Sequence, residues 1–105
     1  MSKILGRLEA LIAERRGASP GSSSVASLFA KGREKMAQKV GEEATETIIA
    51  ALSGDHDKLT SEVADLLFHV MVLLADSGLS ITDVLAELER REGLSGLEEK
   101  AARPK

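Results

Sequence analysis

The chain lacks several residue types that small proteins commonly use to stabilise a fold or build a site. Its 105 residues include no cysteine, tryptophan or tyrosine, and only two phenylalanines. The absence of cysteine excludes disulfides and zinc–thiolate sites, and it is typical of proteins from a reducing compartment. With so few aromatic side chains, the core has to be built from Leu, Ile, Val, Ala and Met. This composition favours a bundle of helices.

The sequence also lacks a large excess of charge and a long apolar run. The net charge is −3, and basic residues are interspersed with acidic ones, so we expect no nucleic-acid partner. No basic segment followed by an apolar one indicates a signal peptide. The longest apolar run is broken by His69, so we expect no membrane partner either. These features predict a cytoplasmic protein.

Apolar residues recur at helical spacing along most of the chain, which is long enough for one domain. We predict a single all-α domain over 1–105, with an N-terminal helix at 3–16 and a loop at 17–24 that contains Pro, Gly and three serines. Further helices follow within 25–93, and 94–105 form a C-terminal tail. The helices within 25–93 are predicted at 25–31, 33–53, about 58–77 and about 80–93.

Five acidic residues on two of these helices form the most informative pattern. Glu42, Glu43 and Glu46 lie on one flank of their helix, because residues three or four apart are within ~60° of each other. Glu62 and Asp65 are spaced i, i+3 on the next long helix. If the two helices are antiparallel, like charges ~5 Å apart repel by ~3 kcal/mol at an effective dielectric constant of ~20. A divalent cation between the helices would remove this repulsion.

The donor types favour a particular class of metal. Carboxylate oxygens suit hard cations, and Mg²⁺ binds through a few carboxylates plus substrate phosphates, with Mn²⁺ as a common substitute. Di-iron helical bundles use Glu-x-x-His pairs, and this sequence has none. We therefore predict Mg²⁺. The alternative is a helical module whose acids are only solvated, although these acids cluster mid-helix, where the helix dipole does not stabilise them.

Basic and hydroxyl side chains precede the acids. Lys35 and Lys39 lie one to two turns before them on the same helix face, where they can either bind phosphate oxygens or reduce acidic repulsion as i, i+4 neighbours. The serines of 22–24 stand at the entrance to a helix, where they can bind phosphate or form a solvated connector. The candidate phosphate-binding residues are Lys35, Lys39, Lys31, Ser23 and Ser24, with Arg33 as a further basic residue close by.

The helix predicted at 58–77 is apolar almost all round except for one polar stripe. Glu62, Asp65, His69 and Asp76 fall within ~60° of one another. His69 is either a hydrogen-bonded core residue or a residue that holds the metal ligand Asp65 in place. A helix that is apolar on several sides requires more partners than one helical hairpin supplies.

We therefore predict a homodimer whose hairpins pair into a four-helix-bundle-like core. The preceding helix also carries one apolar stripe. That stripe consists of Met36, Val40, Ala44, Ile48, Ala51 and Leu52.

The acidic motifs resemble those of a known superfamily. The pattern EE-x-x-E at 42–46, followed by E-x-x-D at 62–65, is similar to that of the MazG-like all-α nucleotide pyrophosphohydrolases. Flanking segments resemble the phosphoribosyl-ATP pyrophosphatase family in particular: ASLF at 26–29, KVGEEATE at 39–46, EVADL at 62–66, FH at 68–69 and GLSGLEEK at 93–100. The chain differs at Ser24, where the family often has an aromatic residue, and this leaves Phe29 as a candidate for stacking on the base.

The resemblance implies hydrolysis of 1-(5-phosphoribosyl)-ATP to 1-(5-phosphoribosyl)-AMP and pyrophosphate, the second step of L-histidine biosynthesis. It implies that Mg²⁺ is held by Glu43, Glu46, Glu62 and Asp65, while Glu42 completes the site or orients the attacking water. The catalytic candidates are therefore Glu42, Glu43 and Glu46, and spacing does not assign their individual roles. The alternatives are a house-cleaning enzyme acting on dUTP or a modified nucleoside triphosphate, or a helical dimerisation or binding module.

Overall fold

The computed structural model describes residues 3–93, and all regular structure within them is helical. This confirms the all-α fold class. The tail predicted at 94–105 lies outside the described residues. The helices are α1 (Lys3–Arg16), the short 3₁₀ helix η1 (Pro20–Ser22), α2 (Ser24–Lys31), α3 (Arg33–Ser53), α4 (His56–Asp76) and α5 (Ile81–Arg91).

Local capping interactions explain where the helices begin and end. The Ser23 hydroxyl accepts a hydrogen bond from the Ala26 N–H at 3.0 Å, so α2 already begins at Ser24, the last residue of the predicted loop. The Asp55 carboxylate caps α4 in the same way, and α4 begins at His56. Between α3 and α4, Gly54 adopts a left-handed conformation with φ 79°, which favours glycine because it has no Cβ.

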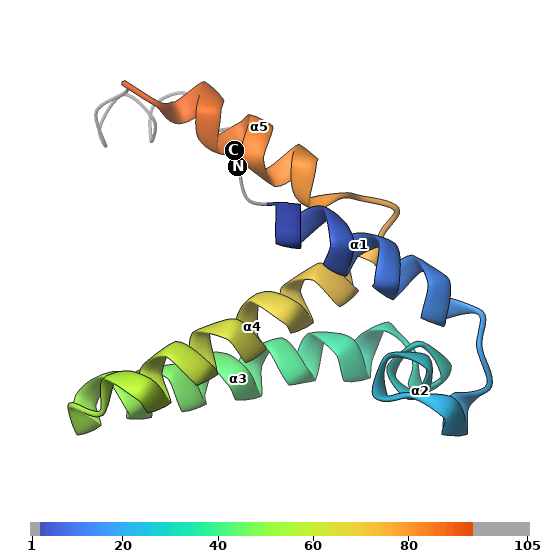
Figure 1. The fold of residues 1–105 in the computed structure, drawn as a ribbon, viewed down its shortest axis with the longest axis horizontal. Helices are drawn as coiled ribbons and strands as arrows, with labels where there is room; N and C mark the ends of the chain where they lie inside the picture. The colour runs from blue at the N-terminus through green and yellow to red at the C-terminus, as the bar shows by residue number, and fades with distance from the viewer. Residues whose placement is uncertain (1–2, 94–105) are drawn as a thin grey trace.

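The helices are arranged around an antiparallel hairpin formed by α3 and α4 (Figure 1). Helix α1 packs against α4 and α2, and α2 also packs against α3. Helix α5 follows α4 after a bend of 107° and points away from the hairpin (Figure 1). The hairpin is therefore covered at one end, while its tip projects from the rest of the molecule.

The hydrophobic core lies at the covered end, where the beginning of α3 meets the end of α4. Each of the five α-helices contributes one or two buried side chains to it. Partly buried apolar residues, among them some from α1 and α5, pack against these side chains. The buried core residues are Ile12, Val25, Leu28, Met36, Met71, Val72 and Ile81.

The predicted apolar stripe of α3 is only partly correct. Met36 is buried, but Ile48 and Leu52 are 60% and 84% exposed, whereas Ala50, which was not assigned to the stripe, is fully buried. The physical reason is that no third helix of the described residues lies over the tip of the hairpin, so only the line facing α4 is covered. Apolar surface therefore remains exposed at the tip.

No single helix among residues 3–93 is both long enough and apolar enough to cross a membrane. Helices α4 and α5 meet that test only when taken together as a bent pair.

Candidate metal and phosphate site

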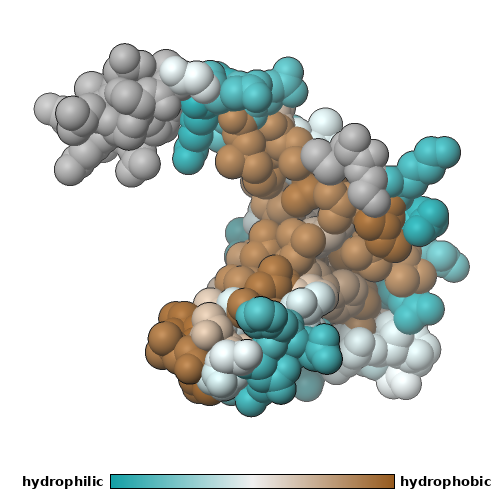
Figure 2. Space-filling view, turned by 60° about the vertical axis from the view of Figure 1, so that its left-hand side comes forward, coloured by the Kyte–Doolittle hydropathy of each residue, from teal (hydrophilic) through white to brown (hydrophobic). Residues whose placement is uncertain are grey.

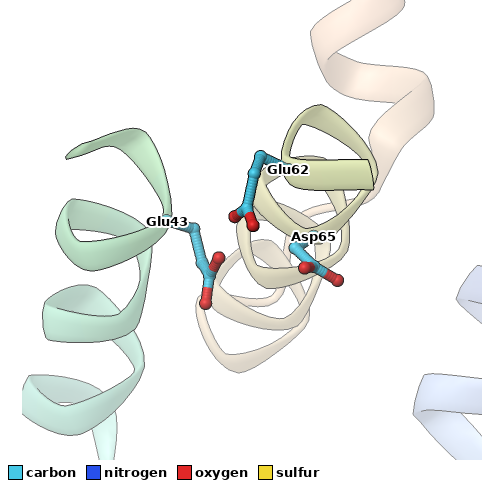
Figure 3. A group of neighbouring side chains, drawn as sticks. All are labelled: Glu43, Glu62 and Asp65. Atoms are coloured by element: carbon cyan, nitrogen blue, oxygen red, sulfur yellow. The ribbon is translucent and has the colours of Figure 1, made fainter. Parts of the chain in front are cut away.

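Three carboxylates meet between α3 and α4. Glu43 reaches from α3 toward Glu62 and Asp65 on α4 (Figure 3), and one oxygen from each lies within 4.8 Å of the others. Glu43 and Glu62 are half-buried and Asp65 is exposed. The antiparallel hairpin creates this group, here called the carboxylate trio, because it places the middle of α3 opposite the first half of α4.

The trio is electrostatically strained. The pKa of Glu62 is raised above its ordinary value of 4.5, first by partial removal from water and then by the negative charges of Glu43, Asp65 and Glu46. Crowded carboxylates stay ionised at neutral pH at a cost unless a cation lies among them. An all-oxygen donor set with this excess of negative charge fits Mg²⁺ or Mn²⁺.

The other two predicted acids lie beside the trio. Glu46 is exposed and contributes no oxygen to the group, although it is close enough to raise the pKa of Glu62. Glu42 accepts a hydrogen bond of 2.8 Å from Gln38, and this bond, together with Lys39, lowers its pKa. The structure therefore brings together three of the four predicted metal ligands and leaves Glu42 as a carboxylate that is readily ionised.

A pocket of about 470 Å³ opens next to Asp65. Its walls come from α2, α3 and α4, and its charge changes from positive at the α2 end to negative at the trio. The lining residues are Ser24, Ser27, Leu28 and Lys31 from α2, Lys35, Lys39 and Glu42 from α3, and Asp65, Phe68 and His69 from α4.

Most of the predicted phosphate-binding residues line this pocket. The exception is Ser23, whose hydroxyl caps α2. Arg33 is engaged elsewhere, because its Nε donates to Asp76 at 2.7 Å. Sequence reasoning missed Ser27, which lines the pocket with Ser24 and Lys31. The spacing of these three residues, i, i+3 and i+7 on α2, is a signal that a helical wheel would have revealed.

His69 lies in the wall of the pocket with one ring nitrogen buried. Its Nδ1 has no hydrogen-bond partner within the described chain, and its ring meets Phe68 edge-on at 5.5 Å between centroids. Burial is the main cause of its lowered pKa; Lys39 adds to the effect, and Glu43 and Asp65 oppose it. His69 is therefore a neutral ring at neutral pH, placed one helical turn from Asp65.

The two phenylalanines have different surroundings. Phe29 packs against the core, and the Arg16 guanidinium lies 5.0 Å from its ring centre. Phe68 also packs against the core, but unlike Phe29 it lines the pocket as well. Phe68 is thus better placed than Phe29 to contact a base or ribose.

Comparison with known proteins adds to this geometry. The family model described as phosphoribosyl-ATP pyrophosphohydrolase matches residues 5–92. A phosphoribosyl-ATP pyrophosphatase from Rhizorhabdus wittichii is 64% identical over all of this chain and 99% of its own length. A protein of the same name from Erythrobacter litoralis is 66% identical over 94% of this chain and 95% of its own. The chain belongs to the phosphoribosyl-ATP pyrophosphohydrolase family.

Proposed function

We propose that this chain hydrolyses 1-(5-phosphoribosyl)-ATP to 1-(5-phosphoribosyl)-AMP and pyrophosphate, the second step of L-histidine biosynthesis. The observation that carries the proposal is the carboxylate trio beside a pocket whose far end is lined by lysines. The names of the close relatives support the substrate. A cytoplasmic location follows from the pathway as a further proposal.

Glu43, Glu62 and Asp65 are the residues that would hold Mg²⁺, with Glu46 at the edge of the group. When bound there, Mg²⁺ supplies the positive charge that phosphoanhydride cleavage requires and acidifies water. Mn²⁺ fits the same oxygens.

The remaining pocket residues bind and orient the reactants. Lys31 and Lys35 hold phosphate oxygens, and the hydroxyls of Ser24 and Ser27 donate to the same groups. Glu42 orients the attacking water and accepts its proton; the Gln38 hydrogen bond and Lys39 lower its pKa and so keep it in the ionised form that can do so. Water attacks, the α–β phosphoanhydride bond breaks, and pyrophosphate leaves toward the lysines.

His69 and Phe68 complete the α4 wall. Since Asp65 is one turn earlier on the same helix, His69 restricts the space into which the Asp65 side chain can turn. Phe68 and Leu28 supply the apolar surface of the pocket, which suits the adenine or ribose of the substrate.

We also propose that the active protein is a homodimer. Apolar side chains remain exposed on both helices of the hairpin, and hydrophobic surface lines the inner side of a hollow between the hairpin and α5 (Figure 2). The exposed residues of the hairpin are Ile48, Ile49, Leu52, Val63 and Leu67. A second hairpin packed here would form a four-helix-bundle-like core, and a monomer at micromolar concentration in light scattering would contradict it.

The deciding test is release of pyrophosphate from phosphoribosyl-ATP, measured with and without Mg²⁺. We expect turnover that depends on Mg²⁺ and that exceeds turnover of dUTP, ATP and oxidised nucleoside triphosphates at equal concentration. Preference for one of those triphosphates would instead indicate a house-cleaning enzyme. If no nucleotide is turned over and Mg²⁺ does not change the melting temperature, the protein is instead a helical binding module.

A further inference from the structure

Lys39 occupies a position between the two halves of the site. Its Nζ lies 3.4 Å from Glu42 Oε2 and 3.6 Å from Glu43 Oε1. Glu42 lines the pocket, whereas Glu43 belongs to the carboxylate trio. One ammonium group therefore bridges the residues that face the substrate and the residues that would hold the metal.

In the part of the chain that the structure describes, Lys39 is also the only lysine or arginine that pairs with a member of the trio. No other lysine or arginine of residues 3–93 forms an ion pair with Glu43, Glu62 or Asp65. The Glu43 side chain is only 15% exposed, so its pairing with Lys39 is shielded from water on most sides. A single ammonium cannot neutralise three carboxylates, and the trio keeps an unbalanced negative charge.

Lys39 and a divalent cation compete for the same ligand. Both are attracted to Glu43, and two positive charges a few ångströms apart repel each other. Lys39 can leave Glu43 without losing its other carboxylate, because Glu42 is one residue earlier on the pocket side. From there its ammonium faces the part of the pocket that contains Lys35.

We propose that Lys39 is an exchangeable cation that couples metal binding to phosphate binding. In the metal-free protein Lys39 lines the pocket while its ammonium pairs with Glu43; when the trio takes a divalent cation, the ammonium leaves Glu43 and becomes a phosphate ligand in the pocket. The inference rests on the proposed function and adds that metal binding and phosphate binding assist each other through Lys39. Because coupling between two ligands is reciprocal, phosphate that engages Lys39 also frees Glu43 for the metal.

The chain offers a matched control in Lys35. It lies one turn before Lys39 on α3, lines the same pocket and is half-buried like Lys39. Within the described residues, however, it makes no ion pair with the trio. A residue that only binds phosphate should behave like Lys35 in a metal titration, and a residue that exchanges with the metal should not.

The test is a titration of full-length wild-type protein, Lys39→Met and Lys35→Met with Mn²⁺ alone, followed by electron paramagnetic resonance of the free ion. Removal of one partly exposed ion pair predicts about fivefold tighter Mn²⁺ binding by Lys39→Met. Lys35→Met should stay within about twofold of wild type, since its charge is farther from the trio. With Mn²⁺ saturating, both variants should bind inorganic pyrophosphate more weakly than wild type.

Unchanged or weaker Mn²⁺ binding by Lys39→Met overturns the exchange. If wild-type protein binds no Mn²⁺, the metal centre of the proposed function fails as well. If Mn²⁺ binds normally but phosphoribosyl-ATP is not hydrolysed, the proposed function fails while the exchange stands.

A second measurement needs no variant. Brief acetylation of wild-type protein, read out for each lysine by mass spectrometry, should label Lys39 faster with Mg²⁺ than without it, because Mg²⁺ releases its ammonium from Glu43. Labelling of the exposed Lys3 at the start of α1 serves as the internal standard. Equal or slower labelling of Lys39 with Mg²⁺ overturns the proposal.

Discussion

Two carboxylate sites on helix α4, one at its C-terminal end and one in its first half, differ in whether basic side chains of the protein neutralise them. At its C-terminal end, Asp76 accepts a hydrogen bond from Arg33 Nε at 2.7 Å, and Arg16 lies 3.9 Å away. The same two arginines donate to the last carbonyls of α4, those of Ala75 and Asp76. Positive charge at a helix C-terminus is stabilising, so this end is closed by the chain's own cations.

In the first half of the same helix, Glu62 and Asp65 face another carboxylate. Their neighbour across the hairpin is Glu43, and Glu43 is the only one of the three that pairs with Lys39. The sequence pattern places Asp76 on the same polar stripe as Glu62 and Asp65, but the structure separates them by their partners. Asp76 connects α4 to α1 and α3, while the trio remains short of positive charge. An acidic residue that lacks a cation in the fold is the better candidate for binding one from solution.

The largest effect is expected from Asp65→Asn. This change keeps the shape of the side chain but removes one negative charge from the trio, so we expect Mg²⁺-dependent pyrophosphate release to fall by about 10²- to 10³-fold. Asp57→Asn, an exposed position in the first turn of α4, is the matched control and should retain wild-type turnover. If Asp65→Asn keeps most of the activity, the trio is not the metal centre.

Asp76→Ala should affect the fold rather than the chemistry. The Asp76 side chain is only 18% exposed, and its removal leaves Arg33 and Arg16 without a carboxylate. We expect the free energy of unfolding to drop by about 2 kcal/mol in urea titrations. Mn²⁺ affinity of the folded variant should match wild type. An unchanged urea midpoint would mean that the ion pairs of Asp76 contribute as little to the free energy of unfolding as ordinary surface ion pairs do.

Glu62→Gln tests the strain at the trio. The folded-state pKa of Glu62 is raised above 4.5, so the folded state binds its proton more tightly than the unfolded state does. Protonated Glu62 therefore favours the folded state at low pH, and this stability is lost as the pH rises through the folded-state pKa and the side chain ionises. Metal-free Glu62→Gln should melt at a higher temperature than wild type at pH 7, and the difference should vanish near pH 4.

Two results would argue against a strained trio. One is a Glu62→Gln variant that is less stable than wild type at pH 7 without metal. The other is a Mg²⁺-induced rise in melting temperature that is equally large in the variant and in wild type.

The helices were predictable because each is specified by nearby residues. Helices α1 and α3 have the predicted bounds, 3–16 and 33–53. Their ends follow from glycine, proline and capping residues, whose effects act within one or two turns. Likewise, Glu43, Glu62 and Asp65 could be predicted to meet, since helical spacing fixes the face of each helix and a short turn makes the helices antiparallel.

Tertiary contacts determined the features that the sequence could not specify. Spacing alone treats Arg33 and Lys35 as equivalent basic residues, but Arg33 reaches Asp76 because packing of α3 against α4 places the beginning of α3 beside the end of α4. Similarly, Ile48 and Leu52 continue an apolar stripe, but they are exposed because none of the elements within residues 3–93 covers the hairpin tip. Helical periodicity shows which residues share a face and not which partner that face meets.

The smallest effect is expected at a third acidic residue, Glu87 on α5, whose charge is fully paired. Arg90 and Arg91 each donate to it at 2.8 Å, and these bonds lower its pKa to about 2. Its stabilising contribution is therefore present above pH 4.5 and lost as the pH falls toward 2. Glu87→Gln should lower the melting temperature slightly at pH 7, less so in 1 M salt because exposed pairs are screened. This difference from wild type should disappear at low pH. At pH 7 its sign is opposite to that of Glu62→Gln, which should be more stable than wild type. A Glu87→Gln variant as destabilised as Asp76→Ala would show that the position of α5 depends on the pairing of Glu87 with the two arginines.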